Sequence, residues 1–276
     1  MGMAASASAA VRLVHPAPTL AVTALSAALG GILLAQSGRG LDAAWAWTVV
    51  AVLGSQVFVG ATNDLVDRSR DTAAARVTKP LVDGSLAPAA AVWVASIGLA
   101  VQLAASLRLG TAFLLLGLLA VGSALAYNLW LSRTPLSVLP YLVSFGVLPL
   151  WIATGVGVPL ERVALAPMLV APFAAAAHLA NALRDFDGDA ALSSRNLAQV
   201  LGRARAFNLA WGMALGVGLA VGAALLLGGP IHPIGLVLGL AGLLAVAQGA
   251  RGADALWLGM LVAAVCWTGA WALSTG

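Results

Sequence analysis

Charge is scarce in this chain of 276 residues. Asp, Glu, Lys and Arg make up only 9% of the sequence, whereas a soluble domain carries about a quarter. The hydrophobic fraction is 61% and the mean hydropathy is +0.99. These values exclude a water-soluble globular domain and predict an integral membrane protein.

Other features are missing as well. The single cysteine, Cys266, excludes an internal disulfide and a cysteine-based metal site. No basic stretch precedes a short apolar segment at the N-terminus, so we expect no cleaved signal peptide. The apolar runs also lack the alternation of a membrane β-barrel, and a bilayer then leaves only α-helices.

Long apolar runs recur along the sequence, and each is long enough to cross a hydrocarbon core of about 30 Å. We predict nine transmembrane helices. The third and fourth are separated only by a short break near Arg108 and Gly110, which leaves a count of eight open. The predicted spans are 19–37, 43–62, 88–107, 110–131, 137–157, 163–183, 205–228, 233–250 and 253–274.

The basic residues test this threading. With nine spans, eleven fall on one side of the membrane and only Arg39, Arg108 and Arg162 on the other. By the positive-inside rule, the N-terminus and both long loops lie in the cytoplasm and the C-terminus lies outside. We therefore expect a multi-pass protein of the cell (plasma) membrane, surrounded by lipid and without a nucleic-acid partner.

The two long loops, 63–87 and 184–204, contain or adjoin seven of the ten acidic residues. The first begins NDLVDRSRD at residues 63–71, and the second region begins NALRDFDGD at residues 181–189. The two stretches match at an offset of 118 residues, which is four predicted spans. Three pairs align: Asn63 with Asn181, Asp67 with Asp185, and Asp71 with Asp189.

This match predicts an internal repeat within a single membrane domain, 1–276. Residues 19–131 and 137–250 would form two four-helix halves, with the last span appended. Gly84 and Gly202 lie at the same offset. Because Asp64 is matched by Ala182, the two halves are not chemically equal. Internal repeats in membrane proteins often place the functional site where the repeats meet.

Within each stretch the matched polar residues are spaced i, i+4, i+8, so a helix continuing past the membrane end would present them on one face. Carboxylates gathered in a region of low dielectric repel one another unless cations are present. Ligands that are all oxygens suit Mg²⁺, which shares its coordination with substrate phosphates. The nearby Arg and Lys side chains suit phosphate oxygens too, so the pattern predicts a lipid diphosphate as the ligand.

Several residues have plainer interpretations. The charged loops can be read as ordinary positive-inside loops, although this does not explain the spaced Asp residues. Tyr127 and Asn128 could mark a span end or line a cavity. His178 lies one turn before Asn181, where packing is the favoured role, and Gln56 could face the same cavity.

Two longer motifs carry a resemblance to a known family. The pattern N63-D64-x-x-D67-x-x-x-D71, followed by R76-x-x-K79-P80, resembles the first aspartate-rich motif of the UbiA superfamily of intramembrane prenyltransferases. The pattern N181-x-x-R184-D185-x-D187-x-D189, followed by R195, resembles the second. The similarity spans essentially the whole chain, which looks most like bacterial members.

The resemblance implies nine helices around a central cavity, and an isoprenyl diphosphate held through two Mg²⁺. It implies metal ligation by Asn63, Asp64, Asp67, Asp71, Asp185, Asp187 and Asp189. Diphosphate or substrate contacts would come from Asn63, Arg76, Lys79, Asn128, Asn181, Arg184 and Arg195. Ionisation would depend on Asp67, Asp71, Asp185 and Asp189, and the ring of Tyr127 would stabilise the allylic cation.

The resemblance leaves the reaction partly open. Lys79 stands where Arg is common before the Pro, and Ala182 stands where some members have a second acid. The leading hypothesis is transfer of the prenyl group to a lipophilic, aromatic acceptor. A membrane terpene cyclase needs the same ionisation, and a cation-coupled transporter is a more remote alternative. The sequence does not choose the acceptor, the prenyl chain length or the oligomeric state.

Overall fold

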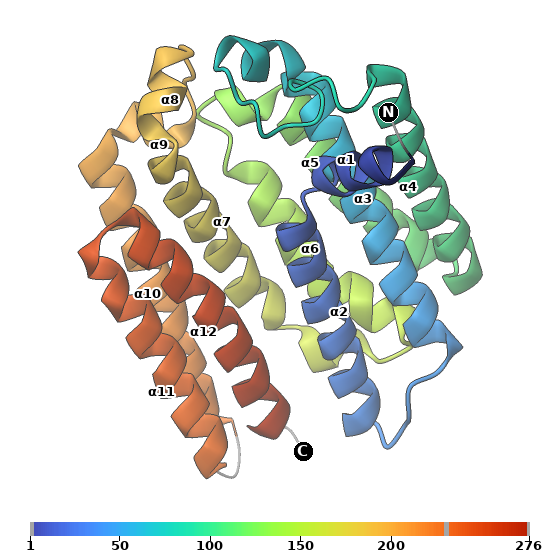
Figure 1. Cartoon of the computed structure of the whole chain (residues 1–276). Helices are drawn as coiled ribbons and strands as arrows, with labels where there is room; N and C mark the ends of the chain where they lie inside the picture. Colours follow the sequence, from blue (N-terminus) through green and yellow to red (C-terminus); the bar gives the residue numbers. More distant parts are fainter. Residues whose placement is uncertain (1–2, 229–231, 275–276) are drawn as a thin grey trace. The chain divides into compact units, whose positions relative to one another are not determined.

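The computed structural model describes residues 3–228 and 232–274, and all regular secondary structure in these residues is helical (Figure 1). Eight helical segments there are long and apolar enough to cross a membrane. The helices group into two compact units. The first comprises residues 1–130 and 147–162, and the second comprises residues 131–146 and 163–276.

The first unit begins with a short helix that the sequence did not predict, α1 (Met3–Leu13). Four membrane-length helices follow, and their bounds lie close to the predicted spans, except that α3 extends well beyond its span. They are α2 (Pro16–Gln36), α3 (Ala43–Ala73), α4 (Pro88–Leu109) and α5 (Thr111–Leu129). Gly110, with φ of 94°, separates α4 from α5 and confirms the predicted break between them.

Helices α3 and α4 pack with their backbones in contact. A β-carbon on Gly54 would lie 2.7 Å from the backbone N of Gln102, and one on Gly98 would lie 2.8 Å from the backbone N of Phe58. Only glycine permits this approach, which is a common way to pack helices in lipid. The rings of Phe113 and Trp151 meet at 5.3 Å elsewhere in the unit.

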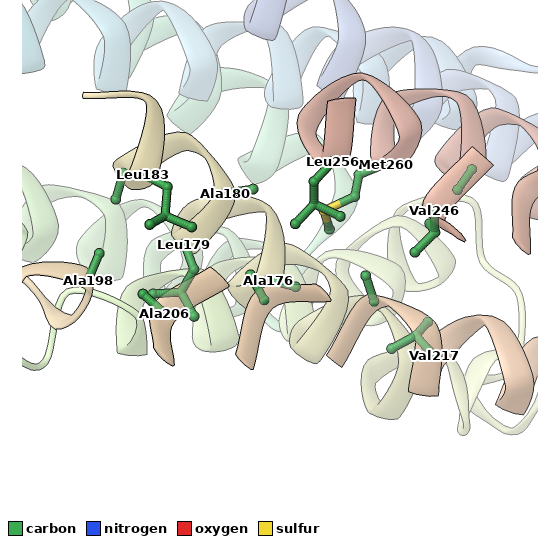
Figure 2. Close-up of a cluster of buried hydrophobic side chains, with 14 of the residues drawn as sticks. Ala176, Leu179, Ala180, Leu183, Ala198, Ala206, Val217, Val246, Leu256 and Met260 are labelled. Carbon is green, nitrogen blue, oxygen red and sulfur yellow. The ribbon is translucent and has the colours of Figure 1, made fainter. Parts of the chain in front are cut away.

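The second unit contains the remaining elements. They are η1 (Leu131–Arg133), the first part of α6 (Leu139–Gly155), α7 (Ala166–Arg184), α8 (Phe186–Ala191), α9 (Leu197–Leu201), α10 (Arg203–Leu227), α11 (Pro233–Ala247), η3 (Gln248–Arg251) and α12 (Ala253–Ser274). The second part of α6 and most of η2 (Leu160–Val163) belong to the first unit. A core of small and aliphatic side chains joins α7, α10, α11 and α12, as Figure 2 shows.

The predicted count of nine spans is not reproduced by helix length alone. The segment predicted at 137–157 forms α6, which has 17 residues and contains Pro149. It is apolar but shorter than the other eight candidates. Large apolar side chains are also exposed along the helices, including Trp93 at 70% and Leu107 at 71%. Such a surface suits contact with lipid chains.

Candidate functional site

The first aspartate motif lies on the last turns of α3. This helix runs without a break from Ala43 to Ala73, so it continues past residue 62, where the predicted span ends, as expected. Asn63, Asp67 and Asp71 therefore belong to one helix at i, i+4, i+8. Burial divides the acids: Asp64 and Asp71 are buried, whereas Asp67 is half-buried.

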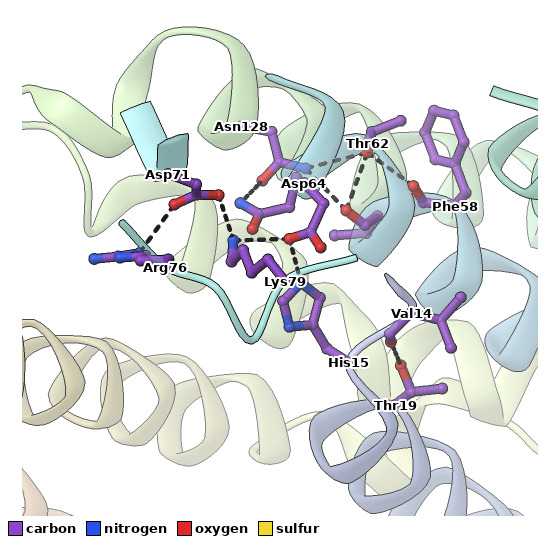
Figure 3. Close-up of polar contacts among 12 residues, drawn as sticks. Val14, His15, Thr19, Phe58, Thr62, Asp64, Asp71, Arg76, Lys79 and Asn128 are labelled. Atoms are coloured by element: carbon purple, nitrogen blue, oxygen red, sulfur yellow. Dashed lines mark hydrogen bonds and ion pairs between the residues drawn. The ribbon is translucent and has the colours of Figure 1, made fainter. Parts of the chain in front are cut away.

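One ammonium group joins the two buried carboxylates (Figure 3). Lys79 Nζ lies 2.7 Å from Asp64 Oδ1 and 2.8 Å from Asp71 Oδ2. The Arg76 guanidinium adds a contact of 3.3 Å to Asp71 Oδ1. Burial lowers the pKa of Lys79, but the hydrogen bonds to both carboxylates raise it more, and the net shift is above the ordinary value of 10.5. Lys79 is therefore held as a cation between the acids.

Two residues before α2 contact this region, one at the cluster and one at the loop that follows it. His15 Nε2 lies 2.9 Å from Asp64 Oδ1, the same oxygen that Lys79 contacts. Arg12 reaches the loop after α3, where its guanidinium donates to Asp83 at 2.9 Å and to Ser85 Oγ at 2.7 Å.

The loop acid Asp83 is strongly acidic. Hydrogen bonds from Ser85, with a further one from the Arg12 guanidinium, lower its pKa from 3.8 to about 2. This carboxylate therefore stays ionised down to low pH and keeps its contact with Arg12.

Asn128, which was predicted to contact substrate, forms hydrogen bonds with residues of α3. Its side chain accepts a hydrogen bond from Asn63 Nδ2 at 3.2 Å, and donates to the carbonyl oxygen of Val59 at 3.0 Å and to Thr62 Oγ1 at 3.2 Å. Asn128 is 3% exposed. In this structure it orients Asn63, and the adjacent Tyr127 is half-buried on α5.

The second motif is not one helix. Helix α7 ends at Arg184, Asp185 lies between helices, and α8 begins at Phe186. The expectation that Asn181, Asp185 and Asp189 share a continuous helical face is therefore wrong. The chain keeps only a local turn here, in which the backbone N of Asp189 donates to the carbonyl oxygen of Asp185 at 2.9 Å.

Three charged side chains of the second motif, those of Arg184, Asp187 and Asp189, have nearby partners. Arg203 pairs with Asp187 at 2.6 Å, and Asn196 Nδ2 donates to Asp189 Oδ2 at 2.7 Å. Arg184 Nε lies 2.7 Å from Asp254, so this predicted diphosphate residue is engaged by α12. Asn181 and Asp185 are exposed.

The predicted diphosphate residue Arg195 is also exposed. It lines an open depression of about 360 Å³ within the second unit, together with Ser194, Gln199, Ala190 and Val200.

The loops after the two motifs close with the same turn. The backbone N of Arg76 donates to the carbonyl oxygen of Asp71 at 3.0 Å, and the backbone N of Ser194 donates to that of Asp189 at 2.9 Å. In each loop a second backbone hydrogen bond, which spans fewer residues than the first, completes the Schellman pattern of a helix C-terminus. Both bonds recur at the offset of 118 residues.

Left-handed residues recur at the same offset. Ala75 has φ of 50° and Ser193 has φ of 55°, and Gly84 and Gly202 have φ of 74° and 78°. Non-glycine residues rarely adopt positive φ, so the alignment of Ala75 with Ser193 is specific. The internal repeat stays a prediction, and these shared turns support it.

The donor set is chemically suited to Mg²⁺, although it is not assembled as a cluster. No group of three or more His, Cys, Asp or Glu side chains within the described ranges is placed to hold an ion. Mg²⁺ needs only one or two carboxylates when waters and substrate phosphates complete its shell. Within the same ranges, Asp64 Oδ2 is buried and has no hydrogen-bond partner, which suits a cation-binding oxygen.

Sequence reasoning gave no role to His15 and counted Arg12 only among the eleven basic residues of the cytoplasmic side. A usable signal was present, because both residues lie just before the first span on the side predicted to hold the Asp-rich loops, where a buried acid needs donors. His178, by contrast, has the contacts of a packing residue. Its Nε2 lies 3.1 Å from Ser137 Oγ, and its ring stacks on Tyr141 at 4.3 Å.

Comparison with known proteins points to one family. The sequence model of the UbiA prenyltransferase family matches residues 24–255. No curated protein matches the chain significantly.

Solved structures share the fold. The apo structure of a UbiA homolog from Aeropyrum pernix K1 is 22% identical with a TM-score of 0.74, covering 91% of this chain and 96% of that one. A UbiA homolog from Archaeoglobus fulgidus bound to GPP and Mg²⁺ is 17% identical with a TM-score of 0.73, covering 97% and 98%. A digeranylgeranylglyceryl phosphate synthase structure is 13% identical with a TM-score of 0.73, covering 96% and 98%.

Proposed function

Because this chain belongs to the UbiA prenyltransferase family, we propose that it is an intramembrane prenyltransferase. It would ionise an isoprenyl diphosphate in the presence of Mg²⁺ and transfer the prenyl group to a lipophilic, aromatic acceptor. The observation that carries the proposal is the pair of aspartate motifs, which end in the same hydrogen-bonded turn 118 residues apart. A relative of the same fold binds GPP and Mg²⁺.

The oxygen ligands for two Mg²⁺ would come from both motifs. In the first they are Asn63, Asp64, Asp67 and Asp71, and in the second they are Asp185, Asp187 and Asp189. When bound, Mg²⁺ neutralises the negative charge that develops on the departing diphosphate.

The basic residues and amides would hold the substrate. Arg76 and Lys79 lie at the end of the first motif and would exchange a carboxylate oxygen for a diphosphate oxygen, as would Arg184, which is paired with Asp254. Arg195 would bind a diphosphate oxygen beside the second motif. Asn63 and Asn181 would contribute amide hydrogen bonds, with Asn128 orienting Asn63. Such cations favour rupture of the C–O bond because they are more strongly attracted to diphosphate after it leaves.

The resulting allylic cation needs an environment that excludes water. The ring of Tyr127 would stabilise it through a cation–π interaction. The acidic loops would lie on the cytoplasmic side of the plasma membrane, where a soluble diphosphate head group is accessible, while the prenyl chain remains among apolar side chains.

The test is diphosphate release by the purified full chain in nanodiscs. Geranyl, farnesyl and geranylgeranyl diphosphates would each be supplied with Mg²⁺ or with EDTA, with and without a lipid extract, and products identified by mass spectrometry. We expect Mg²⁺-dependent release that requires an acceptor. A cyclic terpene formed without an acceptor would favour a cyclase, and no release from any of the three would refute the proposal.

A further inference from the structure

The chain before α2 sits on a glycine of α3. A β-carbon on Gly60 would lie 2.9 Å from the carbonyl oxygen of Val14, so the backbone of Val14 occupies the place of a side chain. Asp64 follows Gly60 by one helical turn on the same face. Docking Val14 on Gly60 therefore brings the next residue, His15, level with the Asp64 carboxylate.

The backbone of His15 is held in an uncommon conformation. Its φ of 51° and ψ of 73° are left-handed, between the end of α1 and Pro16 at the start of α2. This conformation is unfavourable for a residue with a β-carbon, and it persists only where neighbouring contacts impose it. Here the backbone N of His15 donates to the carbonyl oxygen of Arg12, and the carbonyl oxygen of His15 accepts from the backbone N of Thr19 at 3.1 Å.

The side chain of His15 contacts the first motif. His15 Nε2 and Lys79 Nζ contact the same oxygen, Asp64 Oδ1, at 2.9 and 2.7 Å. Asp64 is 1% exposed. Two donors on the same oxygen restrict rotation of the Asp64 carboxylate. His15 therefore helps to set where the carboxylate lies, and with it the position of Lys79.

The same N-terminal segment also holds the loop that carries Lys79. Ala9 and Leu13 of α1 are fully buried against Leu81 and Leu86. Arg12 adds its hydrogen bonds to this loop, one of them to the carbonyl oxygen of Thr78 at 3.0 Å, directly before Lys79.

We propose that His15 is a positioning residue: it fixes the Asp64 carboxylate, and through it places Lys79 for the diphosphate. The inference rests on the proposed function for its consequence, because Lys79 is a proposed diphosphate residue. His15 itself need not touch the substrate.

Substitutions at His15 test this directly. In nanodiscs with Mg²⁺, His15→Ala should weaken binding of inorganic diphosphate by about tenfold, as for loss of a hydrogen bond to a charged group. The KM for the prenyl diphosphate should rise and kcat should also fall, because a displaced Lys79 loses an attraction that strengthens as the diphosphate departs. His15→Gln, whose amide can reach the place of Nε2, should restore binding, whereas the shorter His15→Asn should not.

A matched control is available in the second unit. His232 also precedes a proline at a helix start, where its Nδ1 accepts from the backbone N of Gly235 at 3.3 Å. His232→Ala should leave diphosphate binding unchanged. If His15→Ala behaves like His232→Ala, or if His15→Gln is as weak as His15→Ala, the proposal is wrong.

A second readout separates this inference from the proposed function. Amide hydrogen exchange of residues 74–87, without substrate, should accelerate in His15→Ala and recover in His15→Gln. If the wild-type chain neither binds nor releases diphosphate, the proposed function fails. Accelerated exchange with recovery would then still support positioning by His15, and unchanged exchange would overturn it.

Discussion

Replacing Lys79 with Met tests the charge balance of the first motif. The change removes the ammonium from two carboxylates that are only 1% and 3% exposed. Breaking a buried ion pair by removing one partner destabilises a protein by about 3–5 kcal/mol. Arg76 and His15 remain on the two acids, so we expect a loss near the lower end, about 3 kcal/mol.

The free energy of unfolding can be measured by titration with SDS in mixed micelles, followed by tryptophan fluorescence. Lys79→Arg keeps the charge and serves as the control. Adding Asp64→Asn to Lys79→Met removes the uncompensated charge, so part of the lost stability should return. Because contacting residues couple, the double mutant should depart from additivity by about 1 kcal/mol or more.

Magnesium provides a second arm of the same experiment. A divalent cation can occupy the space between the two acids once the ammonium is gone, so Mg²⁺ should stabilise Lys79→Met more than the wild type. At a concentration one hundred times the Kd, the gain would be about 2.7 kcal/mol. Equal stability of the Met and Arg variants without Mg²⁺ would refute the charge-balance reasoning.

Three further predictions follow from the site. Asp67→Ala and Asp185→Ala should each abolish Mg²⁺-dependent diphosphate release while leaving the SDS unfolding curve near that of wild type, and residual activity close to wild type would count against the metal role. Gly60→Ala should destabilise the chain by about 1–3 kcal/mol through overpacking and speed amide exchange before α2; unchanged exchange would show that the contact is not tight. Because the pKa of Asp83 is lowered from 3.8 to about 2, the stabilisation from the contacts of its carboxylate with Ser85 and Arg12 is fully present above pH 3.8 and is lost as the pH falls toward 2. Amide exchange compared between pH 5 and pH 2.5, corrected for the intrinsic rate, should therefore show loop loosening at the lower pH, and Asp83→Asn should remove most of that difference.

Helix positions were largely readable from the sequence, because long apolar runs have few alternatives in a bilayer. The spans predicted at 88–107 and 253–274 match α4 and α12 closely. Asn63 and Asp71 were correctly placed on one helix, since no helix-breaking residue lies between them. The aspartate motifs themselves were readable because charge is so scarce that their spacing stands out.

The missed features depend on contacts between distant residues. Helix α1 contains mainly Ala and Ser, and its place is set by burial of Ala9 and Leu13 against segments some 70 residues away. The partner of Arg184 is Asp254, and no local sequence pattern predicts that ion pair. The span predicted at 163–183 ends one residue before the end of α7, but the continuous helical face expected through Asp185 was wrong because the chain breaks between α7 and α8.

The N-terminal segment has a consequence for synthesis of the protein. The buried cluster to which it belongs extends to Ala95, and its polar partners Asp64, Asp83 and Ser85 lie within the same stretch. Domains and subdomains can fold as they emerge from the ribosome, N-terminal parts first. The first cluster can therefore close while the ribosome is still translating residues far upstream of Asn181, so the nascent chain need not carry unpaired buried acids into the membrane while the second motif is made.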